Sequence, residues 1–98
     1  MNESLLGLQF DTSKYHKGIQ LVLDFEKYNL SIVQHDGSYG GTQGLFEIMV
    51  SDASGGIELP GITEPGDTVK GFLTLEEVSS ICKKLTTITG NDPVKVNI

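Results

Sequence analysis

The fold is decided by one stretch of the chain, Leu30-Ser-Ile-Val-Gln-His-Asp-Gly-Ser-Tyr-Gly-Gly-Thr-Gln-Gly-Leu-Phe-Glu-Ile-Met-Val50. Two apolar segments, 30–33 and 45–50, flank a loop at 36–44 that contains four glycines and Tyr39. Glycine adopts positive φ angles without a steric penalty, so this density indicates a sharply bent backbone. We therefore predict two strands joined across the loop.

Alternation of apolar and polar residues extends this sheet toward the N-terminus. Residues 19–25 alternate with a period of two, which is typical of a half-buried strand. A short strand is expected at 57–59, ending at Pro60, and residues 68–73 are expected to lead into a helix. At the two ends of the chain, 1–17 form either a loose arm or an edge strand, and 91–98 form either a terminal strand or a tail.

One amphipathic helix is predicted in the C-terminal part. Thr74 and Glu77 have the spacing of a capping box, in which each side chain accepts a hydrogen bond from the other residue's backbone N–H. Gly90 is expected to end the helix. Between these signals the apolar residues recur at helical spacing and form a single stripe, whose members are Val78, Ile81, Cys82, Leu85 and Ile88.

These elements predict a single α+β domain over residues 1–98. We expect a small antiparallel β-sheet of three to five strands, with one C-terminal amphipathic helix packed on one face. A chain of 98 residues is long enough to bury one modest core without disulfides or metals.

The composition excludes several classes of function. Seven Lys and Arg against 13 Asp and Glu give a net charge of −6 and a pI of about 4.6. Such a surface does not attract phosphates, so we expect no nucleic-acid partner. The N-terminus has no secretion signal pattern and no apolar run approaches the ~20 residues of a membrane span, so no membrane partner is expected. The single cysteine allows no intrachain disulfide, which suits a reducing compartment.

No residue pattern typical of catalysis or metal binding is found. His16 and His35 have no ligand-like spacing to Cys82, and a zinc site needs at least three protein ligands. Cys82 lies on the apolar stripe, which favours a buried structural thiol over a nucleophile. Glu76 and Glu77 are explained by the start of the helix, where negative charge is favourable. We therefore expect no enzyme activity, no metal and no cofactor.

The glycine-rich loop is the candidate binding site. It is not a phosphate-binding P-loop, because Gly44 is followed by Leu45 and Phe46 and then by a strand rather than a helix. The glycines either serve only the geometry of a long hairpin loop or help to present Tyr39 to a partner. The candidate binding residues are Ser38, Tyr39, Gly40, Gly41 and Gln43. An acidic outer sheet face is the other surface considered, with Asp24, Glu26, Glu47 and Glu58.

Four segments of the chain resemble a group of short, uncharacterised proteins encoded by tailed bacteriophages. They are Leu30-Ser-Ile-Val33, Ser38-Tyr-Gly-Gly41, Gly44-Leu-Phe-Glu47 and Gly71-Phe-Leu-Thr-Leu-Glu-Glu-Val78. The resemblance covers about half of the chain and leaves out the N-terminal arm and the residues after Gly90. It implies a phage source and brings no activity with it.

Together these observations predict a small acidic non-enzymatic phage protein in the cytoplasm of the host cell. The expected partner is a host protein, such as a defence or replication factor, bound through the 36–44 loop. Two alternatives stay open. The loop could bind a small molecule or nucleotide by using its N–H groups as an anion nest, or the chain could be a structural or assembly component of the virion. The sequence also leaves open whether the chain forms a homo-oligomer.

Overall fold

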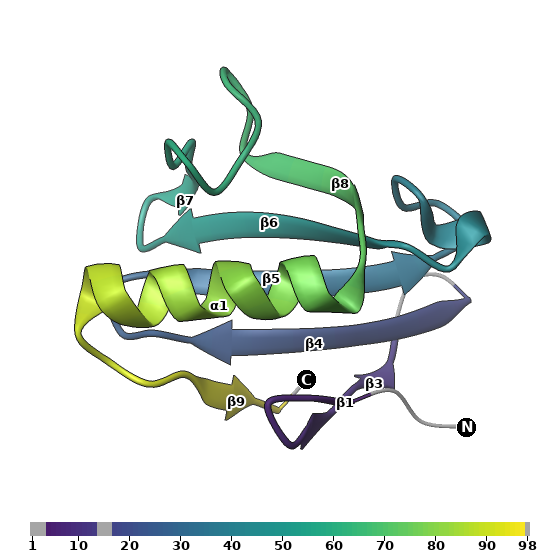
Figure 1. The fold of residues 1–98 in the computed structure, drawn as a ribbon, viewed down its shortest axis with the longest axis horizontal. Coiled ribbons are helices and arrows are strands. Elements are labelled where there is room, and N and C mark those ends of the chain that lie inside the picture. The colour runs from purple at the N-terminus through teal and green to yellow at the C-terminus, as the bar shows by residue number, and fades with distance from the viewer. Residues whose placement is uncertain (1–3, 14–16, 98) are drawn as a thin grey trace.

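The structure is a computed structural model that describes residues 4–13 and 17–97, so His16 lies outside the described residues. The elements follow in chain order: β1 (Ser4–Leu5), β2 (Leu8–Gln9), β3 (Asp11–Thr12), β4 (Gly18–Asp24), β5 (Asn29–His35), the 3₁₀ helix η1 (Gly41–Gln43), β6 (Phe46–Asp52), β7 (Gly55–Gly56), β8 (Val69–Leu73), α1 (Leu75–Thr89) and β9 (Val94–Val96). Figure 1 shows α1 lying across one face of the sheet, in front of β5.

The strand β5 lies at the centre of an antiparallel sheet. It pairs with β4 on one side and with β6 on the other. The opposite edge of β4 is shared by β3 and β9, and the opposite edge of β6 is shared by β7 and β8. A separate two-stranded hairpin is formed by β1 and β2. The two strands predicted on either side of the glycine-rich loop are therefore β5 and β6.

The predicted α+β class is confirmed, but three to five strands was too few, since nine strands form within the described residues. Most of the additional strands have only two or three residues, too few to show an alternating pattern. The strand expected at 57–59 is also wrong, because β7 ends at Gly56 and only the Ile57 N–H still donates to β6, at the Val50 carbonyl oxygen (3.0 Å). Residues 68–73, expected only to lead into the helix, contain the strand β8. Its sequence does not predict a strand, because Gly71 and the left-handed Phe72 interrupt the alternation of apolar and polar residues.

The helix α1 begins and ends where the sequence predicts. Thr74 Oγ1 accepts a hydrogen bond from the Glu77 N–H (3.2 Å), and Glu77 Oε1 accepts one from the Thr74 N–H (2.9 Å). Gly90 follows the helix with φ 72°, and its N–H donates to the Thr86 carbonyl oxygen at 2.8 Å. Ile88 is the exception to the predicted stripe, because its side chain is 49% exposed.

The core fills the space between α1 and the sheet. The helix contributes Val78, Ile81, Cys82 and Leu85, all buried. Facing them are buried side chains of the three long strands: Leu21, Leu23, Leu30, Ile32, Phe46, Ile48 and Val50. Fully burying one such side chain contributes roughly 1.5–3 kcal/mol, so this layer holds the helix on the sheet. The described helices do not include one with the length and apolar character of a membrane span.

Candidate functional site

The 36–44 loop is a compact structure closed by its own hydrogen bonds. Ser38 Oγ donates to the His35 carbonyl oxygen (2.9 Å) and accepts from the His35 N–H (3.0 Å). The turn then continues into η1, which is bounded by Gly40 and Gly44 with φ 87° and 76°. A Cβ atom at Gly41 would overlap the His35 carbonyl oxygen, so only glycine fits there. The glycines therefore serve the geometry of the loop.

Most backbone N–H groups of the loop already have acceptors within the protein. The Gly37 N–H donates to His35 Nδ1 at 3.0 Å, and the Tyr39 N–H donates to Glu47 Oε1 at 2.8 Å. The N–H groups of residues 38, 41, 43, 44 and 45 donate to carbonyl oxygens between His35 and Gly41. An anion nest needs several free N–H groups that converge on one point. The internal bonding leaves few donors for such a ligand.

The Tyr39 side chain leaves the loop and lies against Phe72 of β8. The two rings are stacked, with centroids 6.5 Å apart and planes at 27°. The Phe72 N–H donates to the Tyr39 carbonyl oxygen at 3.2 Å, which ties the loop to the strand. Both side chains are nevertheless largely exposed, Tyr39 by 60% and Phe72 by 56%. We call these two residues the aromatic pair.

The backbone of β8 is distorted at the point where it meets the loop. Phe72 has φ 56°, a left-handed conformation that is uncommon for a bulky residue. Pairing between β6 and β8 shifts register between Phe46 and Ile48, directly opposite this distortion. At the neighbouring Gly71, a Cβ atom would overlap the Cβ atom of Tyr39. Strained residues and bulges of this kind cluster at functional sites.

A cavity of about 230 Å³ lies beside the aromatic pair. It is lined by Tyr39, Glu64, Asp67, Val69, Lys70, Gly71 and Phe72. The Asp67 carboxylate accepts a hydrogen bond from the Thr68 N–H at 2.7 Å. The Glu64 carboxylate makes no hydrogen bond or ion pair with any other residue that the structure describes. The site therefore combines two exposed rings with one carboxylate that is available to a ligand.

The predicted site residues have different places in this arrangement. Tyr39 is exposed and lines the cavity, while Ser38 and Gly41 hold the turn that carries it. Gly40 is buried, and a Cβ atom there would lie 3.1 Å from the Phe72 Cα atom. Gln43 is exposed in η1 and does not line the cavity. Sequence reasoning missed Phe72 as a site residue, because Val69, Leu73 and Leu75 nearby are also apolar and nothing in the sequence distinguishes Phe72 from them.

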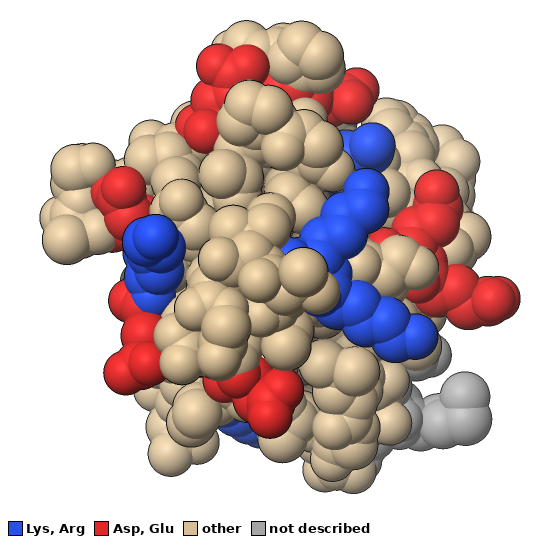
Figure 2. Space-filling model, turned by 60° about the vertical axis from the view of Figure 1, so that its left-hand side comes forward, with Lys and Arg blue, Asp and Glu red and all other residues tan. Residues whose placement is uncertain are grey.

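The other surface considered, the acidic sheet face, is divided among separate local roles. Asp24 accepts from the Glu26 N–H (2.7 Å), Glu47 from the Tyr39 N–H, and Glu58 from the Gly66 N–H (2.7 Å). On the face drawn in Figure 2, acidic side chains lie in several separate places, whereas the basic ones gather mainly in one strip. The carboxylates of Asp24, Glu47 and Glu58 thus each accept a hydrogen bond from a backbone N–H group in a different part of the chain.

Groups that could support catalysis or metal binding are placed as follows. Cys82 is buried among core side chains, and this desolvation raises the pKa of its thiol to about 12. Over residues 4–13 and 17–97, no three His, Cys, Asp or Glu side chains gather closely enough to hold a metal ion. His35 uses its Nδ1 atom to accept the Gly37 N–H within the loop.

Comparison of the chain with models of protein families, with curated proteins and with solved structures finds no match. The class of the protein is therefore defined by its fold and site: a small α+β protein with one helix-covered sheet face and an exposed aromatic pair at one end of the sheet. The phage source implied by the sequence resemblance stays a prediction.

Proposed function

We propose that this chain is a small non-enzymatic phage protein that binds a host protein, within the host cytoplasm, through the 36–44 loop and Phe72. The observation that carries the proposal is the aromatic pair, because two large rings stacked on each other and more than half exposed gain little from the fold itself. Tyrosine is enriched among the residues that dominate the binding energy of protein interfaces. Aromatic contacts also supply a large area at a small entropic cost.

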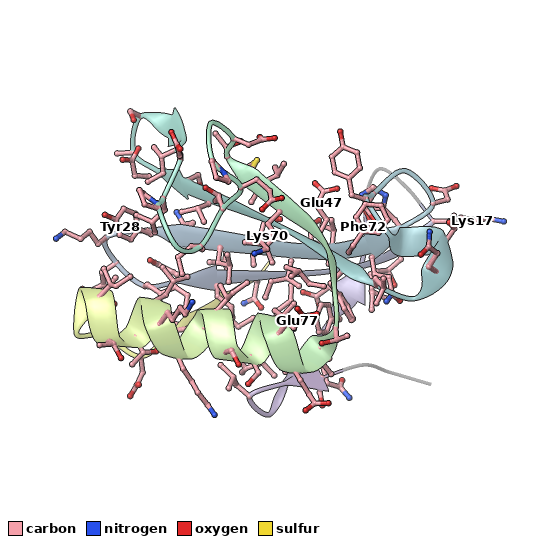
Figure 3. The ribbon with its side chains drawn as sticks, turned by 45° about the horizontal axis from the view of Figure 1, so that its top comes forward. Lys17, Tyr28, Glu47, Lys70, Phe72 and Glu77 are labelled. Carbon is pink, nitrogen blue, oxygen red and sulfur yellow. The ribbon has the colours of Figure 1, made fainter. Side chains whose placement is uncertain are left out.

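The rigidity of the surrounding backbone supports the same proposal. Hydrogen bonds hold Tyr39 on both sides of its Cα atom. Its N–H donates to the Glu47 carboxylate, and its carbonyl oxygen accepts from the Phe72 N–H. A residue fixed in this way loses little conformational freedom when a partner binds. Figure 3 shows Glu47 and Phe72 near each other at the loop end of the sheet. The pair is thus presented from a prearranged surface.

Affinity capture from a lysate of bacterial host cells, followed by mass spectrometry, tests the proposal. The wild-type chain should retain one or a few proteins that the Tyr39→Ala variant does not. Ile88→Ala is the matched control, because Ile88 is 49% exposed on α1 and does not belong to the pair. Equal capture by all three chains would contradict the proposal.

A small-molecule binder is the second candidate, and a different place in the fold favours it. A cavity of about 560 Å³ lies between the β1–β2 hairpin and α1, lined by Leu6, Leu8, Cys82, Lys83, Thr86, Thr87, Asp92 and Pro93. Ligand sites in proteins commonly have volumes of roughly 300–1,000 Å³. A thermal-shift screen separates this candidate, because a compound that binds the native state raises the melting temperature. Leu6→Glu should remove such a shift, whereas Tyr39→Ala should not.

A further inference from the structure

We infer that the cavity beside Tyr39 and Phe72 accepts an arginine or lysine side chain of the partner protein. This inference rests on the proposed function and names the chemistry that the partner must bring. It is carried by three features of the site: the exposed ring faces, the available Glu64 carboxylate, and the direction of the one lysine that lines the cavity.

The aromatic pair offers ring faces to a cation. A guanidinium or ammonium group placed over an aromatic face is attracted by the electrons of the ring, and arginine makes this contact most often. Tyr39 and Phe72 both line the cavity and stay more than half exposed. An aliphatic stem can therefore pack along the rings while the charged end reaches the carboxylates.

The acidic residues of the cavity are held in place by the loop that carries them. The Glu64 N–H donates to the Val69 carbonyl oxygen (3.1 Å), and the Asp67 N–H donates to the Glu64 carbonyl oxygen (2.9 Å). The Gly66 N–H between them donates to Glu58 Oε2. This bonding fixes the backbone while the Glu64 carboxylate keeps its hydrogen-bonding capacity for a ligand. A guanidinium group of the partner would donate charge-assisted hydrogen bonds to this carboxylate.

Lys70 does not neutralise this site, because its charge lies toward α1. In the sheet register Lys70 pairs with Ile48, whose side chain is buried on the face that α1 covers. Lys70 also lines a separate hollow that includes Glu77, and its positive charge adds to the Thr74 hydrogen bonds that lower the pKa of Glu77. Figure 3 shows Lys70 farther from the loop than Phe72. Beside the aromatic pair, the negative charges of Glu64 and Asp67 are therefore not neutralised by Lys70.

The charge of the whole molecule favours the same partner. A net charge of −6 attracts a basic surface and speeds its diffusional encounter. This long-range attraction alone cannot select one binding place, since acidic side chains are spread over the face shown in Figure 2. The cavity supplies the selection, because it brings the ring faces of the aromatic pair and the Glu64 carboxylate to one place.

An NMR titration with capped pentapeptides tests the inference without knowledge of the partner. The three probes carry arginine, alanine or glutamate between glycines. The arginine peptide should shift the backbone amides of residues 39, 64, 71 and 72 in a saturable way, and the other two should not. Glu64→Gln and Phe72→Gly should each weaken binding by about two- to fivefold. Glu76→Gln is the control, because Glu76 is an exposed carboxylate on α1 outside this cavity.

Two results would overturn the inference. One is a set of small shifts spread over many acidic residues and unaffected by Glu64→Gln or Phe72→Gly, which would show diffuse charge attraction only. The other is capture of the host partner that is lost in Tyr39→Ala but unchanged in Glu64→Gln, together with no response to the arginine peptide. The second result would leave the proposed function intact and exclude a basic side chain as the ligand of the cavity.

Discussion

The Tyr39 ring stacks on the Phe72 ring with centroids 6.5 Å apart and planes at 27°, although one residue belongs to a loop and the other to a strand on the far side of β6. The contact joins the β5–β6 connection to β8 and closes that end of the sheet. Both rings remain mostly in solvent. The arrangement therefore stabilises a loop position more than it adds to the core.

The left-handed backbone of Phe72 gives the first prediction. A non-glycine residue in this conformation is strained by about 1–3 kcal/mol, and glycine removes the strain. Phe72→Gly and Phe72→Ala both remove the ring, but only glycine removes the strain. We therefore expect the glycine variant to be the more stable of the two, with a free energy of unfolding about 1 kcal/mol larger. Urea denaturation measures the difference. An alanine variant as stable as the glycine variant would show that the backbone at this position is unstrained.

The close approach of Gly71 to Tyr39 gives the second prediction. An added methyl group at Gly71 would overlap the Tyr39 Cβ atom, so Gly71→Ala should push the loop away from β8. We expect a loss of about 1–3 kcal/mol in the free energy of unfolding, together with loss of partner capture. In Gly56→Ala the nearest atom, on the Thr68 side chain, lies 3.4 Å from the added carbon, so this control should behave as wild type. Unchanged Tyr39 resonances in Gly71→Ala would contradict the close contact.

The buried thiol gives the third prediction. Burial raises the pKa of Cys82 to about 12, so the reactive thiolate is scarce at any pH at which the protein is handled. A thiol reagent should therefore label the native chain slowly and the unfolded chain quickly. Rates measured in buffer and in denaturant provide the test. Prompt labelling of the native chain would mean that α1 does not pack on the sheet through Val78, Cys82 and Leu85.

The capping box gives the fourth prediction, which concerns pH. Hydrogen bonds with Thr74 lower the pKa of Glu77 below its ordinary value of 4.5. A carboxyl with a lowered folded-state pKa stabilises the protein above its unfolded pKa, and this stabilisation is lost as the pH falls through the folded pKa. Between about pH 5 and about pH 3 the wild type should therefore lose more stability than Glu77→Gln. Parallel losses in urea denaturation would exclude an ionised Glu77 as part of the cap.

Much of the fold was predictable because its signals are local. The capping box at Thr74 and the end of α1 at Gly90 depend on residues close together in the sequence, and the structure places both as predicted. The short edge strands were harder to predict. The strand β7 has only two residues, too few to show a pattern, and β9, one of the two alternatives expected for 91–98, depends on pairing with the distant β4. Ile88 matched the helical spacing but lies beyond the edge of the covered surface, which no local pattern reports.

The candidate site was predictable only in part for the same reason. The glycine density marked the bent loop, and Tyr39 was its single aromatic residue. Phe72 joins it through a bulge in β8, and the bulge depends on pairing with β6. Glu64 reaches the same cavity from a third segment of the chain. Such long-range juxtapositions follow from the tertiary fold and leave no spacing pattern in the sequence.

The role of Tyr39 as the centre of the binding surface is tested most directly by two measurements on the Tyr39→Ala variant. They are its affinity for the captured host protein and its melting temperature. Tyr39 is largely exposed, so its truncation should leave the melting temperature nearly unchanged. If Tyr39 is the centre of the binding surface, the dissociation constant should rise by at least about tenfold, the effect expected for a binding hot spot. An unchanged dissociation constant with a melting temperature several degrees lower would contradict the binding role of Tyr39 and make it a structural residue.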